Sequence, residues 1–245
     1  MNVVVLGATR GIGRALARRF AERGDRVFLL GRDMAALERS ARDIQIRANS
    51  TAAIGVAHCD LSAPDSFVPA MDAAAAALST IDAVVVTAGD FATQPVLEQD
   101  LERTRHLLTV NFTNTVLFCE QARTRLLSRG GTLCGFSSVA GDRGRKPVIL
   151  YGAAKAGLAH YLEGLDYKYR AQGLHVVCVK PGFVKTSMTT GLKPPPFAGE
   201  ADGVAADVIR AIDRGQSVVY TPRIWWAVMM VIRSLPRFVM RRIQF

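Results

Sequence analysis

Short apolar runs alternate along the chain with longer segments in which apolar residues recur at helical spacing. The runs predicted as strands are Val3–Leu6, Val27–Leu30, Ala52–Ala57, Ala83–Thr87, Thr132–Phe136, Val176–Val179 and Val218–Tyr220. The segments predicted as helices are Gly11–Arg23, Met34–Ala48, Ser66–Leu78, Leu101–Leu127, Tyr151–Arg170 and Glu200–Arg214. Because the apolar runs are continuous, we expect the strands to be covered on both faces, as in parallel sheets. The pattern therefore predicts an α/β fold with one doubly wound, Rossmann-type parallel sheet and helices on both faces.

One domain accounts for nearly all of the 245 residues. We predict that residues 1–222 form this domain and that residues 223–245 form an amphipathic C-terminal extension. The run Pro194–Pro196 is expected to be a stiff local break and not a domain boundary.

The composition does not point to a membrane-spanning, secreted or metal-binding protein. No apolar run reaches the roughly 18 residues of a spanning helix, and the N-terminus lacks the basic region of a signal peptide. The four cysteines, Cys59, Cys119, Cys134 and Cys178, lie far apart without metal-ligand spacing, which is typical of reduced core residues. These features predict a cytoplasmic chain without a bound metal.

The charge is strongly basic, because 31 Lys and Arg against 21 Asp and Glu give a net charge of +10. The last acidic residue is Asp213, and the stretch Gln216–Phe245 holds five arginines and no carboxylate side chain. Such a surface attracts phosphorylated metabolites, acidic proteins or anionic lipid. Nucleic acid is not expected as a partner, because no binding motif accompanies the charge.

A glycine-rich loop, Gly7-Ala8-Thr9-Arg10-Gly11-Ile12-Gly13, joins the first predicted strand to the first predicted helix. Glycines here let the backbone turn tightly and approach a pyrophosphate, whose charge then lies at the helix N-terminus. The place of the loop in the opening βαβ unit predicts a dinucleotide site. The residues expected to contact the cofactor are Gly7, Thr9, Arg10, Gly11, Ile12 and Gly13.

The end of the second strand bears on the choice of cofactor. An acidic residue at this point binds an unphosphorylated ribose, whereas arginine suits a 2′-phosphate. Here Arg32 comes first, Arg10 lies in the glycine loop, and Asp33 follows. The two arginines favour NADP(H) over NAD(H). Solvated surface arginines are the alternative, and Asp33 leaves NAD(H) open.

The candidate catalytic residues centre on Tyr151 and Lys155, which lie at positions i and i+4 of a predicted helix and therefore on one face. A cation beside a tyrosine stabilises the phenolate, so we expect a lowered pKa for Tyr151. Ser138 lies 13 residues before Tyr151 at a strand end, where open sheets bind ligands. Asn111 lies inside the long segment predicted as a helix.

Taken in order, these motifs resemble those of the short-chain dehydrogenase/reductase family. The resemblance covers almost the whole chain and includes the glycine loop, the Asn111, Ser138, Tyr151 and Lys155 tetrad, and two further motifs. These are Thr87-Ala88-Gly89 after the fourth strand and Pro181-Gly182 after the sixth. The chain departs from the family at Thr87, where many members carry asparagine, and this concerns a local packing detail.

The resemblance implies a role for each matching residue. Tyr151 would donate a proton to a carbonyl oxygen during reduction, and Ser138 would hydrogen-bond that oxygen. Lys155 would hold the nicotinamide ribose, and Asn111 would support a proton relay through water. Ser137 is the competing serine, but the family's offset of 13 residues before Tyr151 selects Ser138. The other implied cofactor contacts are Asp60 and Leu61 at the adenine ring, with Ala88, Gly89, Pro181, Gly182, Val184 and Thr186 elsewhere.

A basic loop and the C-terminal extension bear on the substrate. Arg143, Arg145 and Lys146 lie between Ser138 and Tyr151, so we expect them at the mouth of the site, bound to a phosphate or carboxylate. A solvated loop is the alternative. The extension combines two tryptophans and large aliphatic residues with arginines, which is typical of a helix lying in a membrane interface. A core or subunit contact is the alternative.

Three stretches resemble decaprenylphosphoryl-2-keto-ribose reductases more closely. They are Ser137–Arg145, Tyr151–Leu158 and the extension from Val228 to Arg237. This resemblance implies reduction of the 2-keto group of a polyprenylphosphoryl pentose, which gives the arabinofuranose donor for cell-wall glycans. It also implies a flavin-dependent oxidase as partner and a peripheral position at the inner face of the cell membrane. The wider family implies a homo-oligomer.

Two other functions are weighed against this one. The first is another carbonyl reductase, such as a 3-oxoacyl-carrier-protein reductase or a lipid carbonyl reductase. The second is a catalytically silent nucleotide-binding scaffold at a membrane, which is disfavoured because the tetrad is complete.

Overall fold

A computed structural model describes residues 1–48 and 54–243. The strands of its main sheet are β1 (Asn2–Leu6), β2 (Arg26–Gly31), β3 (Gly55–His58), β4 (Ala83–Val86), β5 (Gly131–Phe136), β6 (Leu174–Pro181) and β9 (Val218–Thr221). They pair in the order β3-β2-β1-β4-β5-β6-β9, and every pair is parallel. The predicted doubly wound sheet is confirmed. The predicted strand Ala52–Ala57 begins at Gly55 within the described residues, and its positions 52 and 53 lie outside them.

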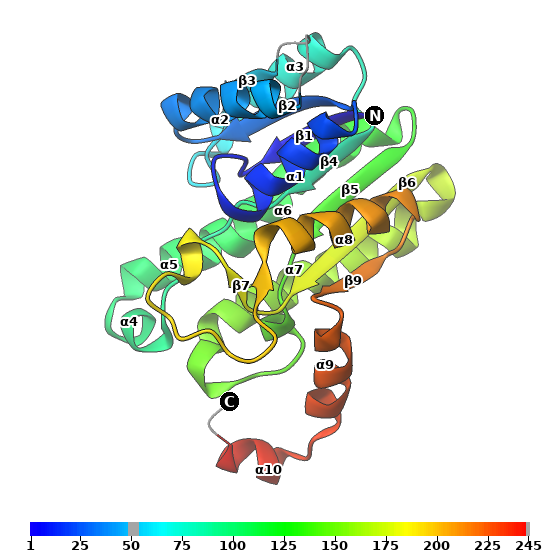
Figure 1. Ribbon diagram of the computed structural model, residues 1–245. Coiled ribbons are helices and arrows are strands. Elements are labelled where there is room, and N and C mark those ends of the chain that lie inside the picture. Colours follow the sequence, from blue (N-terminus) through cyan, green and yellow to red (C-terminus); the bar gives the residue numbers. More distant parts are fainter. Residues whose placement is uncertain (49–53, 244–245) are drawn as a thin grey trace.

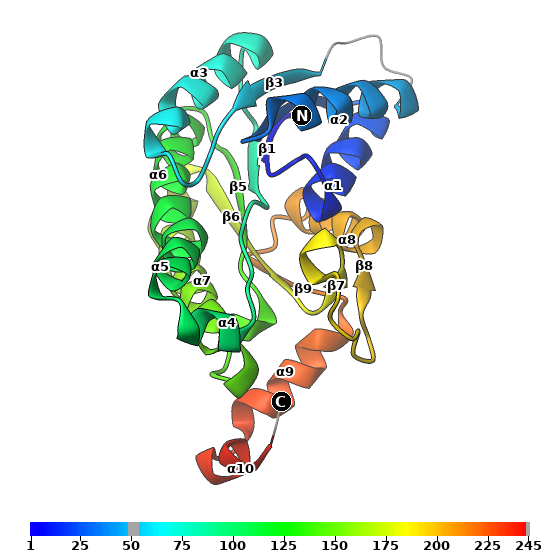
Figure 2. The ribbon, with the colours of Figure 1, turned by 90° about the vertical axis from the view of Figure 1, so that its left-hand side faces the viewer.

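Helices cover both faces of the sheet (Figure 1). They are α1 (Gly11–Glu22), α2 (Met34–Arg47), α3 (Phe67–Leu78), α4 (Gln94–Gln99), α5 (Leu101–Leu108), α6 (Asn114–Leu127), α7 (Ile149–Tyr169), α8 (Ala201–Asp213), α9 (Ile224–Ser234) and α10 (Arg237–Arg242). In Figure 2, α3, α6 and α7 lie on one side of the sheet, and α1, α2 and α8 lie on the other. A small parallel pair, β7 (Val184–Lys185) and β8 (Gly199–Glu200), flanks the loop that precedes α8.

Alternate residues of each strand feed two separate cores. In β1, Val4 and Leu6 pack with residues of α3, α6 and α7, whereas Val3 and Val5 pack with residues of α1, α2 and α8. All four side chains are buried, and each contributes about 1.5–3 kcal/mol by leaving water. Covering on both faces explains why the strands are continuously apolar in the sequence. The four cysteines are buried and free, as predicted.

The predicted helix Leu101–Leu127 is wrong in one respect, because it is interrupted. Between α5 and α6 the chain forms a π-helical turn, Thr109–Thr113. The wider turn leaves the carbonyl of Val110 to accept a hydrogen bond from the Thr115 hydroxyl at 2.7 Å. Such turns insert one residue into a helix and often occur at functional sites. Here the turn contains Asn111.

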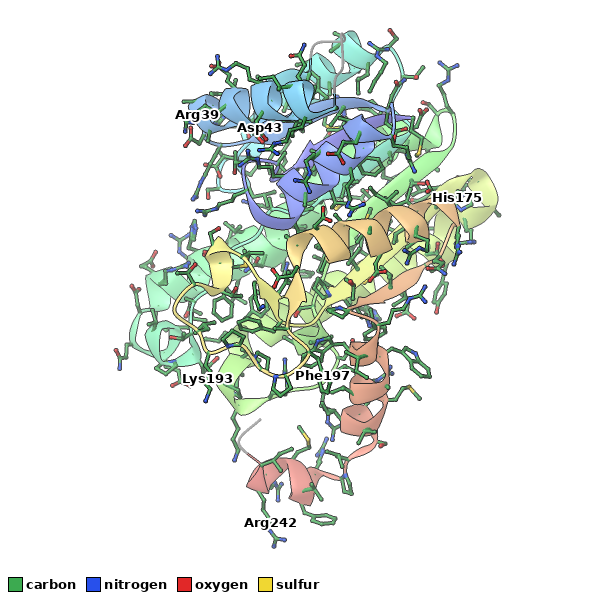
Figure 3. All side chains as sticks on the ribbon, viewed as in Figure 1. Arg39, Asp43, His175, Lys193, Phe197 and Arg242 are labelled. Carbon is green, nitrogen blue, oxygen red and sulfur yellow. The ribbon has the colours of Figure 1, made fainter. Side chains whose placement is uncertain are left out.

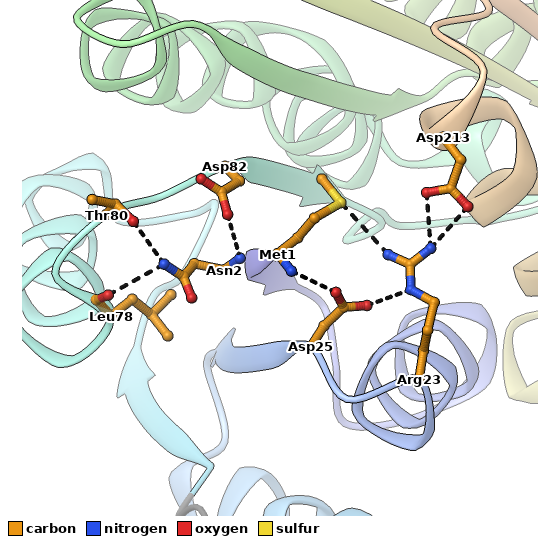
Figure 4. Close-up of polar contacts among 8 residues, drawn as sticks. All are labelled: Met1, Asn2, Arg23, Asp25, Leu78, Thr80, Asp82 and Asp213. Atoms are coloured by element: carbon orange, nitrogen blue, oxygen red, sulfur yellow. Dashed lines mark hydrogen bonds and ion pairs between the residues drawn. The ribbon is translucent and has the colours of Figure 1, made fainter.

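Polar contacts close the amino ends of the strands (Figure 4). Arg23, at the end of α1, donates from Nη1 to both carboxylate oxygens of Asp213 at 2.8 Å and from Nε to Asp25 at 2.6 Å. Asp25 also accepts from the Met1 amine at 2.7 Å. These contacts tie α1 and α8 together on one face and leave the loops at the opposite, carboxyl edge to form a binding site.

The C-terminal extension is packed against the domain along one face. Trp225, Met229 and Ile232 of α9 form a small buried cluster with Val139, while α9 and α10 together project past the carboxyl edge of the sheet (Figure 1). Pro236 separates the two helices. Within residues 1–48 and 54–243, no helix is both long enough and apolar enough to cross a membrane.

Candidate active site

The glycine loop between β1 and α1 is shaped by contacts that leave no room for side chains. Gly7 has φ +95°, and a Cβ on Gly13 would lie 2.2 Å from the carbonyl oxygen of Gly7. Thr87, at the end of β4, secures the loop because its hydroxyl donates to the carbonyl of Leu6 at 2.9 Å. The side chain of Arg10, the residue before α1, makes no capping hydrogen bond to the helix. Its first backbone N–H groups thus border a loop poor in side chains, which fits the pyrophosphate of a dinucleotide.

The loop after β6 lies opposite the glycine loop. A Cβ on Gly11 would lie 3.4 Å from Cγ2 of Thr186, so the two segments face each other closely. The backbone N–H of Thr186 donates to the hydroxyl of Thr189 at 3.0 Å, which fixes the turn. Pro181 and Val184 are buried, so their predicted contact with a cofactor would have to be made by backbone groups.

At the end of β2, Asp33 caps α2, because its carboxylate accepts from the N–H of Ala36 at 2.9 Å. Arg32 and Arg10 are exposed, and neither side chain forms a hydrogen bond or an ion pair within the described part of the chain. The carboxylate that left NAD(H) open is thus engaged by the backbone, while both guanidinium groups remain available to an anion.

The predicted adenine contacts lie at the end of β3. The Asp60 carboxylate accepts from the N–H of Ser62 at 2.8 Å, and the carbonyl of Leu61 accepts from the Asn114 amide at 2.6 Å. Leu61 is buried and Asp60 is half-buried. Both belong to the carboxyl edge that also carries the glycine loop.

Tyr151 and Ser138 meet where α7 begins and β5 ends. The Ser138 hydroxyl is close enough to the Tyr151 phenol to influence its pKa. The Ser138 hydroxyl also accepts from the N–H of Ala140 at 3.1 Å and donates to the carbonyl of Pro181 at 3.4 Å. Ser137 is different, because it is buried and its hydroxyl donates to the carbonyl of Lys155 at 2.7 Å. Only Ser138 is therefore beside the phenol.

Lys155 and Asn111 approach each other beside Gly89. The Lys155 Nζ donates to the carbonyl of Phe136 at 2.8 Å and lies 5.8 Å from the centre of the Tyr151 ring. Asn111 is fully buried, and its amide both donates to the carbonyl of Asp90 at 2.7 Å and accepts from the same residue's N–H at 3.0 Å. A Cβ on Gly89 would lie 2.9 Å from the Asn111 oxygen and 3.6 Å from the Lys155 Nζ. The four predicted tetrad residues are thus brought together.

The predicted lowering of the Tyr151 pKa is wrong for this chain. Burial raises the pKa of Tyr151 to about 12, and the neighbouring Ser138 side chain opposes the rise only in part. Burial likewise lowers the pKa of Lys155 to about 8, because a buried ammonium group loses hydration. The predicted lowering followed from the attraction between the two groups alone, whereas loss of hydration determines the direction of both pKa shifts.

The basic loop contacts the C-terminal extension. Arg143 donates to the carbonyl of Leu235 at 2.9 Å, and Lys146 donates to the carbonyl of Arg241 at 2.8 Å. Burial lowers the pKa of Arg145. The loop and the extension therefore form one unit beside Ser138, and a substrate role for the three cations remains a prediction.

Three residues of the site are absent from the sequence-based predictions. Asp90 holds Asn111 through its backbone and is paired with Arg103 through its carboxylate. Phe91 packs edge-on against the Tyr151 ring, with centroids 5.2 Å apart. Trp225 of α9 lies directly on Gly182. The sequence indicates Asp90 and Phe91 only through their position directly after the Ala88-Gly89 motif. Nothing in the sequence around Trp225 indicates its place in the site.

Burial of Lys155 predicts a particular dependence of stability on pH. Its pKa in the folded chain is about 8, against 10.5 for an exposed lysine, so between these values the unfolded chain holds the extra proton. The free energy of unfolding should therefore rise with pH across this interval. Urea denaturation of the wild type and of Lys155→Met should show a stability difference that moves in favour of the wild type as the pH rises from 8 to 10.5.

Lys168→Met, at an exposed position of α7, is the matched control and should show no such trend. A pH-independent difference for Lys155→Met would contradict the burial of a depressed amine.

Comparison with known proteins places this geometry in a family. The family model described as short chain dehydrogenase matches residues 1–196. An uncharacterized oxidoreductase of Mycobacterium tuberculosis is 31% identical over 241 residues, covering 98% of this chain and 96% of the relative. A 3-oxoacyl-[acyl-carrier-protein] reductase of Chlamydia muridarum is 30% identical over 190 residues, covering 77% of this chain and 76% of that enzyme.

A solved structure has the same fold along nearly the whole length. The short-chain dehydrogenase from Sphingobium yanoikuyae, determined in complex with NADPH, superposes with a TM-score of 0.81 at 24% identity, covering 98% of this chain and 95% of that one. The family match and the tetrad geometry lead to one conclusion. The chain belongs to the short-chain dehydrogenase/reductase family and is an NAD(P)-dependent oxidoreductase.

Proposed function

We propose that this oxidoreductase reduces the 2-keto group of a polyprenylphosphoryl pentose, giving an arabinofuranose donor for glycan synthesis. The observation that carries the proposal is that the basic loop is hydrogen-bonded to the C-terminal extension beside Ser138. Cations suited to a sugar phosphate and an apolar segment suited to a lipid chain lie at one edge of the site. Two of the three stretches that resemble keto-ribose reductases, Ser137–Arg145 and Val228–Arg237, belong to this same unit.

The tetrad is suited to reduction of a carbonyl group. When bound, the nicotinamide cofactor supplies a hydride to the carbonyl carbon. Tyr151, with its pKa raised to about 12, is protonated at neutral pH and can give its proton to the carbonyl oxygen. Ser138, beside the Tyr151 phenol, can turn its hydroxyl from the Pro181 carbonyl to donate a hydrogen bond to that oxygen. Lys155 and Asn111 lie behind the phenol, where a proton can be returned to it.

The cofactor proposed is NADPH. Arg10 and Arg32 are exposed without partners among the described residues, and Asp33 is occupied as the cap of α2. Two guanidinium groups near the ribose end of the site suit a 2′-phosphate.

An anaerobic coupled assay tests the proposed function. A flavin-dependent polyprenylphosphoryl-ribose oxidase, the proposed partner, converts its lipid-linked substrate to the 2-keto sugar, and oxidation of NADPH or NADH is followed by absorbance. Oxidation that requires both the oxidase and the lipid-linked sugar supports the proposal. A chain that binds NADPH but oxidises none of it overturns the substrate assignment. Reduction of acetoacetyl-coenzyme A would then favour the second candidate, a 3-oxoacyl-carrier-protein reductase like the Chlamydia relative.

Removing the proton donor should separate chemistry from binding. Tyr151→Phe is expected to lower turnover at least ~100-fold, because general acid catalysis is lost while the cavity keeps its shape. Fluorescence titration should show NADPH binding close to that of the wild type. Tyr167→Phe, at an exposed tyrosine of the same helix, is the control and should leave turnover unchanged. Substantial turnover by Tyr151→Phe would contradict the assigned role.

Reversing the charge at Arg32 should change cofactor preference. Arg32→Asp is expected to raise the KM for NADPH at least ~tenfold while leaving that for NADH nearly unchanged, because only the 2′-phosphate is repelled. Steady-state kinetics with both cofactors make the measurement. Arg42→Asp, at an exposed arginine of α2, controls for general charge effects. An unchanged preference would mean that Arg32 only faces solvent.

We further propose that the extension docks on an anionic membrane. The outward face of α9 exposes Trp226, Met230 and Val231, with exposed fractions of 57%, 52% and 62%. Five arginines and no carboxylate side chain lie in the last thirty positions, Gln216–Phe245. Apolar side chains flanked by arginines suit the headgroup region of an anionic bilayer.

Vesicle sedimentation tests this docking. The full chain should sediment with phosphatidylglycerol vesicles and much less with phosphatidylcholine vesicles, and a triple variant, Trp226→Ser, Met230→Ser and Val231→Ser, should lose at least ~tenfold in affinity. Ile46→Ser, at an exposed apolar residue on α2, is the control. Failure to sediment with either vesicle overturns the docking. A dimer that the triple variant dissociates would instead make this face a subunit contact.

A further inference from the structure

Trp225 joins the C-terminal extension to the loop that follows β6. Its side chain is 6% exposed, and a Cβ on Gly182 would lie only 2.1 Å from the indole Nε1. The indole therefore occupies space that only a glycine leaves open. Its N–H donates to the carbonyl of Phe197 at 3.3 Å. Figure 3 labels Phe197 in this loop, close to α9.

The same indole lies next to both chain segments that hold Ser138. Trp225 clusters with Val139, which directly follows Ser138. Gly182 directly follows Pro181, whose carbonyl accepts from the Ser138 hydroxyl at 3.4 Å. One side chain of the extension thus packs on the neighbours of a catalytic serine and of its acceptor.

The loop from Thr186 to Ala198 has little else to hold it. It leaves the carboxyl edge of the sheet beside the catalytic residues, which is where open α/β sheets bind ligands. Within the described residues, Trp225 is the one side chain from outside the loop that hydrogen-bonds to positions 190–198. Several loop residues are exposed, including Met188 and Phe197. The Trp225 indole therefore ties this part of the loop to another element of the fold.

The extension itself is fixed on its other side by the basic loop. Asp142 begins this loop and accepts from Lys180 at 2.6 Å and from the Tyr220 hydroxyl at 2.7 Å. Beyond it, Arg143 and Lys146 reach the carbonyls of the extension. Trp225 thus contacts both Val139, which precedes the anchored basic loop, and Phe197 in the loop of residues 186–198.

We propose that Trp225 is a positioning residue for substrate specificity: its indole, seated on Gly182 and bonded to Phe197, holds residues 186–198 as a wall of the substrate site beside Ser138. The family match ends at residue 196, so this wall is braced by a part of the chain outside it. The proposal holds for any carbonyl substrate and does not require the keto sugar.

Hydrogen–deuterium exchange of the full chain tests the brace directly. Trp225→Ala should raise amide exchange in residues 186–198 at least ~tenfold while β1 and β4 stay protected, because only a local contact is lost. Gly182→Ala should raise exchange in the same segment, because its methyl group displaces the indole. Trp225→Phe, which keeps a ring but loses the N–H, should give a smaller rise. The adjacent Trp226→Ala, at an exposed position, is the matched control and should leave residues 186–198 unchanged.

Kinetics give a readout that general loss of structure would not move. With the lipid-linked keto sugar or acetoacetyl-coenzyme A, whichever is turned over, Trp225→Ala should raise KM at least ~fivefold and lower kcat less than ~twofold, since the wall binds substrate but performs no chemistry. Trp225→Phe should restore most of the affinity.

Unchanged exchange in residues 186–198 of Trp225→Ala, or a rise spread evenly over the chain, overturns the proposal. A fall in kcat at constant KM overturns it as well. If neither ketone is turned over, the substrate assignment fails, and exchange alone decides the role of Trp225.

Discussion

Burial of a single ammonium group is the constraint on which the active site depends. Lys155 is 5% exposed, so its amine must find acceptors inside the protein or lose its charge. One acceptor is the carbonyl of Phe136 at the end of β5. The amide oxygen of Asn111, which lies in a π-helical turn, approaches the same amine beside Gly89. The helix α7, the end of β5, the loop at Gly89 and the π-helical turn are therefore positioned around the Lys155 amine. This arrangement also positions the phenol of Tyr151, which lies on the same helix.

The fold could be predicted because its signal is local and repeated. Continuous apolar runs indicated strands covered on both faces, and the glycine loop after β1 indicated which edge of the sheet binds ligands. The π-helical turn at Asn111 was not predicted, because one inserted residue leaves the helical spacing of its neighbours intact. The cap at Asp33 was predictable from the sequence, because an aspartate directly before the first residue of a helix is a preferred cap.

The site was harder to predict where its properties depend on burial. Spacing placed Tyr151 and Lys155 on one helical face, but only the packing around them determines how much hydration each loses. The contacts of the basic loop with Leu235 and Arg241 join positions about ninety residues apart, and nothing in either segment alone indicates the other. Trp225 is the clearest example of a site residue that the sequence does not indicate, since its position depends on the absence of a side chain at Gly182.

The four buried cysteines have a practical consequence for anyone studying this chain. Burial raises the pKa of Cys59 and Cys119 to about 12 and that of Cys178 to about 11, and it raises the pKa of Cys134 as well. The thiolate is the nucleophile, so the native thiols are nearly inert toward alkylating dyes and peroxide near neutral pH. A single cysteine introduced on the surface would be the one reactive label on the folded chain. Uptake of further dye would report unfolding, so the protein carries its own spectroscopic reporter of structural integrity.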